Sequence, residues 1–451
     1  MKNDREKIEM KEKKALGLDP RIDEIKETVA ETKKVNPAMV CAQTILDTTL
    51  VLDSAGEFKA KVPSGKILVA PYNVYRQLKT DRQGRNVLKP YRNKFSEYFR
   101  RYAGEDLSGK SLLVWRTGGL GDIMFSQPII QYLKKKYPTC RIIYATIPRN
   151  IGLLTCWPLG LVDRVVSMPF SLELLKTTDY HLTFEGCIER CRQAERDNCY
   201  DIFQEMANVK FDPREYPVKL NTHPQIIEAL RPIFEGNKVV LVQPRATSVL
   251  RTLPQTTLTK ITKGLQDLGF FVGFADSIER STQIKMIAQS MQKDVDLAKI
   301  MNLASVSKGP EFAIAMSSLC SGAIVTDSAY SHFFPALGKP VVGIYGAFKG
   351  VLRMRYYDNA DWVEPPTDWN ECGHKPCFFH ESKLFECPYI KDKKLPGCLE
   401  AINVDEVLNK FIALYDKVNP NDRIRQENSI PRGNEADISR TEILTEASNI
   451  S

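Results

Sequence analysis

The stretch SLLVWRTGGLGDIMFSQPIIQYLKKKYP, residues 111–138, decides the fold class. It opens with a short apolar run, Leu112–Trp115, which is typical of a strand buried on both faces. The turn Thr117–Asp122 follows, and an apolar pattern of helical period then covers Ile123–Tyr137 until Pro138. This order of strand, glycine-rich turn and helix predicts the start of a βαβ unit.

The same alternation of strands and helices continues after this stretch, toward a second α/β half. Further strands are predicted at Arg141–Thr146 and Arg164–Met168, before a segment with Pro217, Pro224 and Pro232 interrupts the pattern. The pattern then restarts with strands at 238–242, 270–274, 322–326 and 340–345 and helices at 255–268, 311–318 and 329–337. Strands that alternate with helices predict parallel sheets, and so an α/β chain with two halves.

The domain organisation predicted from these patterns has five parts. Two α/β domains at 111–220 and 238–415 follow an N-terminal extension at 37–110. In that extension KILVAPYNVY, residues 66–75, predicts a strand, and residues 89–110 predict a basic, aromatic helix followed by a turn. The outer parts are a charged flexible arm at 1–36 and a polar, disordered tail at 419–451.

Composition excludes several classes of protein. The chain has 451 residues, 43% of them hydrophobic and 26% charged, and a net charge of +8. These values are those of a globular chain, and +8 on this length permits an anionic partner without requiring one. No apolar run is long enough to span a membrane, and no secretory signal opens the chain. Eleven scattered cysteines favour a reducing, cytoplasmic location.

The turn after the first strand is the first candidate for chemistry. Gly118, Gly119 and Gly121 allow close approach of the backbone to a ligand, and the helix that follows favours negative charge at its start. Their spacing matches neither the dinucleotide fingerprint nor the Walker A loop. Asp122 has two interpretations: it caps the helix, or it acts as a general base at the edge of a cleft.

Two further loops contain residues suited to phosphate. Asp327 and Ser328 follow a predicted strand, Ser328 is placed to cap the next helix, and His332 would lie in that helix's first turn. The backbone amide of Ala329 would face a phosphate there. In the loop after the strand at 238–242, Thr247 supplies a hydroxyl and Arg251 a guanidinium that can bind phosphate oxygens in pairs.

A cysteine-rich segment is a candidate metal site. Its members are Cys372, Cys377, Cys387 and Cys398, with His374 and His380 between them. Structural zinc sites use closely spaced pairs of cysteines, and only the first two have such a spacing. Structural zinc is therefore the less favoured interpretation, and the cysteines at 187, 191 and 199 are interpreted as buried thiols.

Together the motifs resemble a known family. The stretch at 111–138 is similar to the opening of the bacterial ADP-heptose–lipopolysaccharide heptosyltransferases, which belong to glycosyltransferase family 9. AIVTDSAYSHFFPALGKPVVGIYGAF, residues 323–348, resembles the second motif of that family, and Arg251–Pro254 resembles its Lys-x-Trp-Pro element. The cysteine-rich segment also resembles a stretch common near the family's end.

The resemblance implies a GT-B fold of two Rossmann-like domains facing a cleft. It implies metal-independent, inverting transfer from a nucleotide-diphosphate sugar, without a cofactor, to a glycan or lipid-linked acceptor, in the cytoplasm or at the inner membrane surface. By the same resemblance Asp122 is the general base on the acceptor side, where the three glycines shape the turn. The donor diphosphate would meet Thr247, Arg251, Asp327, Ser328, Ala329 and His332.

Departures from the family pattern keep two alternatives open. Ala329 and Tyr330 stand where the family has Gly-Pro, and Leu253 stands where it has Trp. These changes leave the donor sugar undetermined and permit a non-catalytic nucleotide-sugar-binding or structural module. A DNA-modifying glycosyltransferase, suggested by the basic, aromatic residues at 90–101, is a further, less favoured alternative, and it would bind DNA with strong salt dependence.

Overall fold

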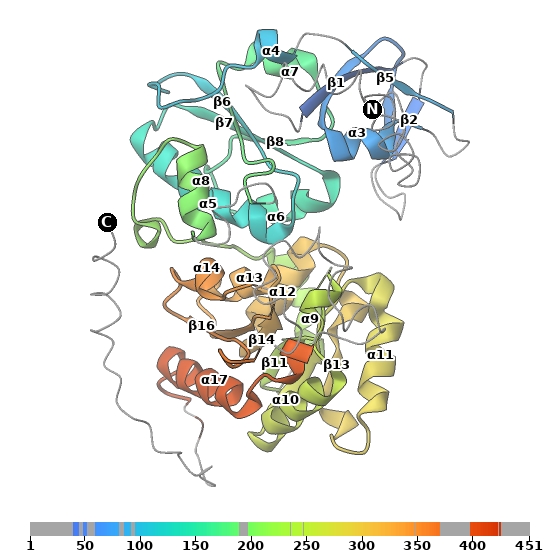
Figure 1. The fold of residues 1–451 in the computed structure, drawn as a ribbon, viewed down its shortest axis with the longest axis vertical. Helices are drawn as coiled ribbons and strands as arrows, with labels where there is room; N and C mark the ends of the chain where they lie inside the picture. The colour runs from blue at the N-terminus through green and yellow to red at the C-terminus, as the bar shows by residue number, and fades with distance from the viewer. Residues whose placement is uncertain are drawn as a thin grey trace, which may run out of the picture.

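The computed structural model describes residues 39–44, 48–51, 59–80, 85–91, 95–188, 197–234, 236–246, 248–346, 348–369, 397–422 and 424. Two parallel-sheet lobes lie one above the other in Figure 1, and a smaller antiparallel sheet flanks the upper one. The fold is therefore α/β of the GT-B type, as the sequence predicts. The predicted arm at 1–36 lies outside the described residues.

The upper lobe, called here the N-lobe, is built on a four-stranded parallel sheet in the order β10-β6-β7-β8. Its strands are β6 (Ser111–Trp115), β7 (Arg141–Thr146), β8 (Arg164–Ser167) and β10 (Tyr180–Thr183). Residues 112–115 are buried on both faces of the sheet, which explains their unbroken apolar run. The helices of this lobe are α5 (Leu120–Lys136), α6 (Ile151–Thr155), α7 (Leu172–Thr177) and α8 (Cys199–Met206).

The lower lobe, called the C-lobe, contains a six-stranded parallel sheet in the order β13-β12-β11-β14-β15-β16. Its strands are β11 (Val239–Gln243), β12 (Phe271–Phe274), β13 (Ile300–Asn302), β14 (Gly322–Thr326), β15 (Val341–Ile344) and β16 (Ala360–Val363). Its helices include α10 (Gln255–Asp267), α11 (Ser281–Ser290), α12 (Pro310–Leu319), α13 (Tyr330–Ala336), α14 (Val351–Met354), α16 (Gly397–Glu400) and α17 (Val404–Val418). In chain order this is the doubly wound arrangement 3-2-1-4-5-6 of Rossmann-like domains.

The proline-rich connection between the lobes is partly helical. Pro224 opens α9 (Pro224–Phe234), because a proline is tolerated in the first turn of a helix, and Pro232 lies near its end. Helix α9 packs against α12 of the C-lobe. In the same region the amide of Leu220 donates to the carbonyl of Ala336, so the chain has already reached the C-lobe there.

The N-terminal extension forms an antiparallel sheet in the order β5-β1-β4-β9. These strands are β1 (Met39–Thr44), β4 (Ile67–Pro71), β5 (Leu88–Pro90) and β9 (Phe170–Ser171); β2 (Thr48–Val51) pairs with β3 (Lys59–Val62), and α3 (Tyr72–Leu78) follows β4. Strand β9 comes from the N-lobe and attaches the extension to it. The strand predicted at 66–75 is therefore correct only in its first half.

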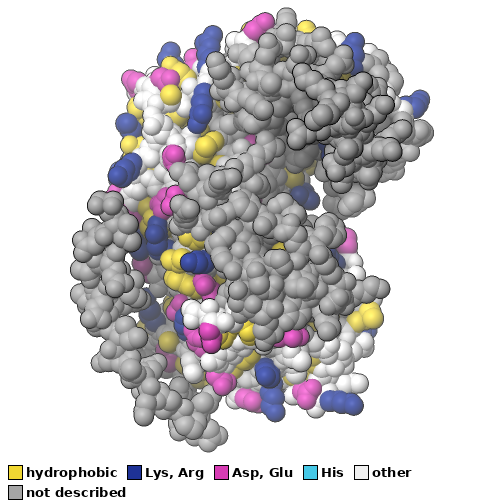
Figure 2. Space-filling model, in the orientation of Figure 1, with side chains coloured by type: hydrophobic (Ala, Val, Ile, Leu, Met, Phe, Trp, Pro, Cys, Tyr) yellow, Lys and Arg dark blue, Asp and Glu magenta, His cyan; other side chains and the backbone are white. Residues whose placement is uncertain are grey.

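The helix predicted within 89–110 is largely wrong, because among the described residues of this range only one turn, α4 (Phe95–Tyr98), is helical. The chain instead hydrogen-bonds as an extended segment: Arg100 and Tyr102 exchange backbone hydrogen bonds with His181 of β10. Phe99 and Tyr102 are buried, so these aromatic side chains pack inward rather than forming an exposed patch. On the face drawn in Figure 2, Lys and Arg are interspersed with Asp and Glu.

Candidate functional site

The carboxyl ends of the two parallel sheets face each other across the lobes. In doubly wound sheets, ligands bind where the strand order reverses, outside the carboxyl ends of the two central strands. In the C-lobe this point lies between β11 and β14, which end at Gln243 and Thr326. In the N-lobe it lies between β6 and β10, which end at Trp115 and Thr183.

At the N-lobe point, Asp122 is held by two hydrogen bonds. Its Oδ2 accepts from Arg116 Nη2 at 2.8 Å and from the amide of Gly119 at 3.0 Å. The second bond is half of a capping box, because Gly119 is the N-cap of α5 and Asp122 the third residue of its first turn. The capping interpretation of Asp122 is thus confirmed, while Oδ1 has no hydrogen-bond partner among the described residues.

The electrostatics of this pair keep Asp122 ionised. Burial raises the pKa of Asp122, but the charge and hydrogen bond of Arg116 outweigh it, and the pKa lies below its ordinary value. Arg116 itself is buried, and its Nη1 donates to the carbonyl of Phe184 at 3.0 Å. Glu185 follows on the same strand end and accepts from the amide of Thr117.

The predicted donor-side residues gather at the C-lobe point. Arg251 Nη1 donates to the carbonyl of Asp327 at 2.9 Å and lies 3.7 Å from its carboxylate. Ser328 does not cap α13, contrary to the prediction, because the N-cap is Ala329. The Ser328 hydroxyl instead donates to Gln243 Oε1, from the end of β14 to the end of the neighbouring β11. Thr247 lies outside the described residues.

His332 connects the two sides of the site. It is buried on α13, and burial lowers its pKa to about 4, so its imidazole is neutral. Its ring lies against the glycine turn: a Cβ on Gly121 would be 3.0 Å from His332 Cδ2. It also packs edge-to-face on Phe125, with ring centroids 4.8 Å apart. The glycine turn and the start of α13 are therefore in direct contact across the lobes.

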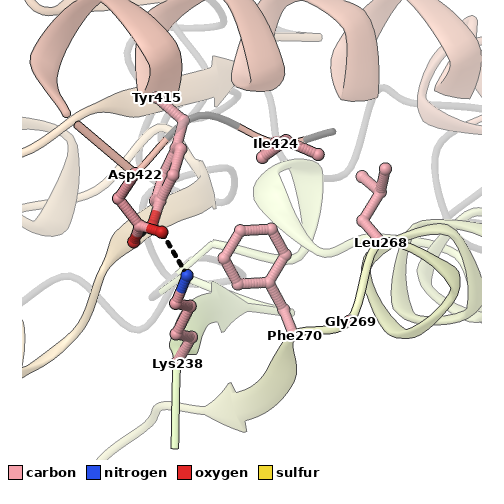
Figure 3. A pocket seen from close by; sticks show the side chains of 7 residues that line it. All are labelled: Lys238, Leu268, Gly269, Phe270, Tyr415, Asp422 and Ile424. Carbon is pink, nitrogen blue, oxygen red and sulfur yellow. Dashed lines mark hydrogen bonds and ion pairs between the residues drawn. The ribbon is translucent and has the colours of Figure 1, made fainter. Parts of the chain in front are cut away.

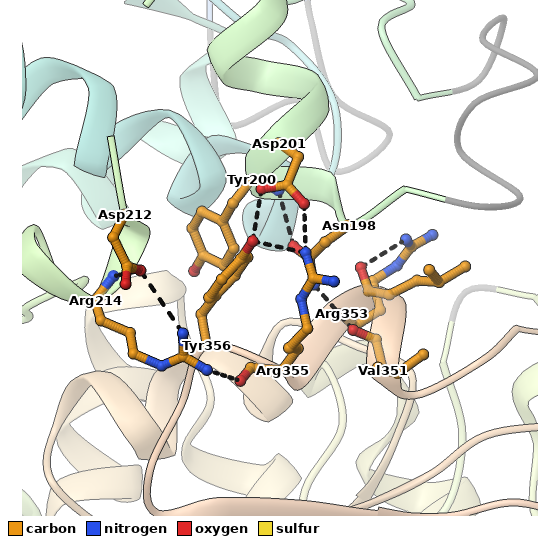
Figure 4. Close-up of polar contacts among 10 residues, drawn as sticks. Asn198, Tyr200, Asp201, Asp212, Arg214, Val351, Arg353, Arg355 and Tyr356 are labelled. Carbon is orange, nitrogen blue, oxygen red and sulfur yellow. Dashed lines mark hydrogen bonds and ion pairs between the residues drawn. The ribbon is translucent and has the colours of Figure 1, made fainter. Parts of the chain in front are cut away.

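A polar seam beside this contact fixes the lobes in this arrangement, and Figure 4 shows its members. Arg353 Nη1 donates to Cys199 Sγ at 2.7 Å, and Asn198 Nδ2 donates to the carbonyl of Val351 at 2.9 Å. Asp201 accepts from Arg355 at 2.5 Å and from the Tyr356 hydroxyl at 2.7 Å. The start of α8 in the N-lobe is thus bound to residues 351–356 of the C-lobe.

Sequence reasoning missed Arg116, Glu185, Gln243, Arg353 and the seam. Arg116 and Gln243 offered a usable signal, since each is a polar residue at the end of an apolar strand. Arg353 and Cys199 offered none, because they meet only through the tertiary fold. Cys187 and Cys199 are buried, as predicted, and burial raises the pKa of the Cys199 thiol to about 12.

Most of the cysteines considered as metal ligands lie outside the described residues. Cys372, Cys377 and Cys387 lie beyond them, and Cys398 is half-buried. In the part of the chain that is described, no group of three or more His, Cys, Asp or Glu is placed to hold a metal ion. None of the helices in that part is both long and apolar enough to cross a lipid bilayer.

The pocket in Figure 3 is separate from this site. Lys238 and Asp422 form an ion pair at its wall, and the Tyr415 hydroxyl donates to Asp422 at 2.8 Å. Lys238 precedes β11, so the pocket lies at the opposite edge of the sheet from Gln243. Asp422 belongs to the predicted disordered tail, whose first residues are therefore packed on the C-lobe, while 425–451 lie outside the described residues.

Comparison with known proteins gives a family match for part of the chain. Residues 197–382 match the model of glycosyltransferase family 9 (heptosyltransferase). This part of the chain, less than half of its length, is therefore similar to a glycosyltransferase family 9 domain. This match confirms the resemblance seen in the motifs and makes the protein a glycosyltransferase. The matched range begins at α8, so the glycine turn of 117–122 lies outside it.

Solved structures confirm the GT-B fold of this chain. A family 9 glycosyl transferase from Veillonella parvula has a TM-score of 0.52 at 13% identity, covering 69% of this chain and 99% of that one. The ADP-heptose lps heptosyltransferase II of E. coli has a TM-score of 0.51 at 16% identity, with 68% and 99% covered. No curated protein matches the sequence.

Proposed function

We propose that this glycosyltransferase moves a sugar from a nucleotide-diphosphate sugar to a hydroxyl of a glycan or lipopolysaccharide-type acceptor. The observation that carries the proposal is the contact between the two strand-end sites. Asp122 lies on one side of it, and Arg251 and His332 lie on the other. A carboxylate thus faces a cationic and hydrogen-bonding site suited to a diphosphate, which is the arrangement that sugar transfer between two bound substrates requires.

The proposed reaction is a single displacement with inversion. The acceptor oxygen attacks the anomeric carbon while the bond from that carbon to the diphosphate oxygen breaks. The acceptor proton passes to Asp122, and Oδ1 is the oxygen available for it, since Oδ2 is occupied by Arg116 and Gly119. The leaving nucleoside diphosphate keeps the electron pair, and the guanidinium of Arg251 stabilises its negative charge without a metal ion.

The protonation state of Asp122 suits this role at neutral pH. Because Arg116 holds its pKa low, Asp122 is a carboxylate before the reaction. A carboxylate of low pKa is a weak base, so proton transfer comes late, when the bond to the anomeric carbon has made the acceptor hydroxyl acidic. Arg116 therefore serves to orient the base rather than to strengthen it.

The first substrates to test follow from the E. coli match. That protein's name specifies ADP-heptose and lipopolysaccharide, so ADP-heptose is the first donor and a lipopolysaccharide core the first acceptor for this chain. We place the acceptor on the N-lobe, beside Asp122, and the donor on the C-lobe. A lipid-linked acceptor would bring the enzyme to the inner surface of the membrane from the cytoplasm.

Thermal unfolding with a panel of nucleoside diphosphates and nucleotide sugars tests the donor site. One nucleotide should stabilise the protein, by about 2.7 kcal/mol at a hundredfold excess over its Kd. The stabilisation should be the same with and without a chelator. No stabilisation by any member of the panel would favour a non-catalytic module instead, and stabilisation lost on chelation would overturn the metal-independent mechanism.

Asp122→Asn tests the base. We expect sugar transfer to fall by at least about a hundredfold, since general base catalysis contributes at that scale, while nucleotide binding remains. Asp163→Asn is the matched control, because Asp163 pairs with Lys134 on the N-lobe at 2.7 Å, away from the site. Unchanged turnover in Asp122→Asn would remove Asp122 from the mechanism.

A further inference from the structure

Three side chains form a hydrogen-bonded chain that crosses from one lobe to the other beside the site. His332 Nδ1 lies 3.1 Å from the hydroxyl of Tyr357, which follows α14 in the C-lobe. The Tyr357 hydroxyl is in turn hydrogen-bonded to the hydroxyl of Tyr200, on α8 of the N-lobe. His332 and Tyr200 are 2% and 3% exposed, so water is not a ready substitute for these partners.

The other ring nitrogen of His332 is directed at the site. A Cβ on Gly121 would be 3.5 Å from Nε2, so this edge of the ring faces the turn that carries Asp122. No described residue makes a hydrogen bond with Nε2. This nitrogen is not among the fully buried unpaired atoms, so, placed where the lobes meet, it is available for a ligand.

The proton on His332 can occupy only one of its two nitrogens. The ring is neutral, because burial lowers its pKa to about 4. Both tyrosines keep their hydroxyl protons, because burial raises the pKa of each. If Nδ1 carries the proton, Nε2 is an acceptor and repels a phosphate oxygen; if Nε2 carries it, Nε2 donates to one.

The direction of donation along the hydrogen bonds between Tyr200, Tyr357 and His332 decides between these two forms of the imidazole. When Tyr200 donates to Tyr357 and Tyr357 donates to Nδ1, each hydroxyl proton has an acceptor. When the chain runs the other way, Nδ1 donates to Tyr357 and Tyr357 to Tyr200, and the Tyr200 proton has no acceptor among the described residues. In the first direction the donor without a described partner is Nε2–H, which keeps access to solvent at the site, whereas in the second it is the hydroxyl of the buried Tyr200. A buried donor without a partner costs about 1–3 kcal/mol, so the first direction is favoured.

We propose that Tyr357 and Tyr200 are positioning residues that hold His332 in its Nε2–H form, so that it donates a hydrogen bond to an oxygen of the donor diphosphate. The identity of that oxygen rests on the proposed function. Because Tyr200 belongs to the N-lobe and His332 to the C-lobe, this form is fixed only while the lobes are together. Donor affinity is thereby coupled to closure of the lobes.

Nitrogen NMR of the full chain with 15N-labelled histidine reads the form directly, without any ligand. The chain has five histidines, and the spectrum of His332→Gln assigns the signals of His332. The wild type should show His332 as Nε2–H. Tyr357→Phe and Tyr200→Phe keep the packed rings but remove a hydroxyl from the series of hydrogen bonds, so its direction of donation is no longer fixed. His332 should then become a mixture of the Nδ1–H and Nε2–H forms.

The control is Tyr144→Phe, which removes a buried hydroxyl bonded to Ser126 at 2.9 Å in the N-lobe core. It should leave the His332 signals unchanged. A wild-type His332 protonated at Nδ1 overturns the proposal. So does a Tyr357→Phe spectrum identical to that of the wild type.

Calorimetric titration with ADP and with inorganic pyrophosphate tests the consequence for binding. Tyr357→Phe and Tyr200→Phe should each raise the Kd by about tenfold, and Tyr144→Phe should not change it. Equal Kd values in all four proteins overturn the coupling. If neither ligand binds the wild type, the proposed function fails, and the spectrum still decides whether the two tyrosines hold His332.

Discussion

At the scale of single residues, Gly118 is the position of the glycine turn with the least room for a side chain. A Cβ there would lie 2.5 Å from Arg116 Nη2 and 2.6 Å from Asp122 Oδ2, because the ion pair folds directly over the glycine. We expect Gly118→Ala to separate Arg116 from Asp122, lower the free energy of unfolding by about 1–3 kcal/mol and abolish transfer. Denaturant unfolding and the transfer assay measure both effects.

Gly119→Ala is the matched control for this prediction. Its Cβ would lie 3.6 Å from Asp122 Oδ2, an ordinary contact, and the backbone angles of Gly119 suit any residue. We expect a loss of no more than about 1 kcal/mol, from the poorer N-cap, with the ion pair intact. If the two alanine variants behave alike, the ion pair is not what Gly118 accommodates.

His181 makes stability depend on pH. Its Nδ1 accepts from the amide of Arg100 at 2.8 Å, so a proton there would face an N–H, and burial lowers its pKa from 6.5 to about 4. Unfolding raises that pKa, so the unfolded chain binds the extra proton more readily. The stability that a neutral His181 contributes is complete above about pH 6.5 and is lost as the pH falls toward 4.

The measurement is the free energy of unfolding between pH 7 and pH 4. A shift of this size corresponds to about 3 kcal/mol for His181, and His332, whose pKa is also about 4, adds a loss in the same range. In His181→Gln the baseline stability should be lower and the decline with acid shallower. An unaltered decline would assign the acid sensitivity to other groups.

At the scale of elements, the seam between α8 and residues 351–356 combines ion pairing with stacking. Arg355 and Arg214 lie over the ring of Tyr356, with centroid distances of 4.6 and 5.1 Å. The Asp201 and Arg355 side chains are 36% and 43% exposed, so solvent screens their ion pair. The stacked tyrosine should therefore hold the lobes more strongly than the ion pair does.

Denaturant unfolding of seam variants checks this ranking. A double-mutant cycle of Asp201→Asn and Arg355→Gln should give a coupling of at most about 1 kcal/mol. Tyr356→Ala should cost more than that, since it removes the ring beneath both guanidinium groups as well as the hydrogen bond to Asp201. A coupling larger than the Tyr356→Ala loss would reverse the order.

The elements that sequence patterns predicted are those whose signals are local. Strand Arg141–Thr146 was predicted at its exact bounds, because an apolar run buried on both faces needs no other information. The helix predicted at 89–110 was largely wrong because the backbone of Arg100 and Tyr102 hydrogen-bonds to His181, which lies far along the chain. Serine is a residue type that commonly caps helices, which is why Ser328 was predicted to do so. Its hydroxyl instead donates to Gln243, and these two residues are close only because β11 and β14 are neighbours in the sheet.

The candidate site divides in the same way. Asp122, Arg251, Asp327 and His332 could be chosen because each lies in a motif at a strand end. Tyr200, Tyr357 and Arg353 could not, since their positions depend on how the lobes meet. Local patterns thus locate each half of the site, and the contact between the halves requires the structure.

At the scale of the whole molecule, one hydrophobic core runs through both lobes. The same buried cluster contains Val114 and Ile130 of the N-lobe and Leu241 and Phe333 of the C-lobe. Phe125 stands at the junction: its ring contacts Tyr200 at 4.9 Å and His332 at 4.8 Å between centroids. Two lobes that share a core gain stability from each other, so neither unfolds without exposing part of the other.

We therefore expect calorimetry to give one cooperative unfolding transition for both lobes, with equal calorimetric and van't Hoff enthalpies. Phe125→Ala should cost about 3–5 kcal/mol and separate the transition into two, because it removes the ring that joins the lobes. Phe274→Ala, a buried ring in a cluster confined to the C-lobe, is the control: it should lower the midpoint and leave one transition. Two transitions in the wild type would mean that the lobes fold independently and that their contact at His332 is too weak to link donor binding to closure.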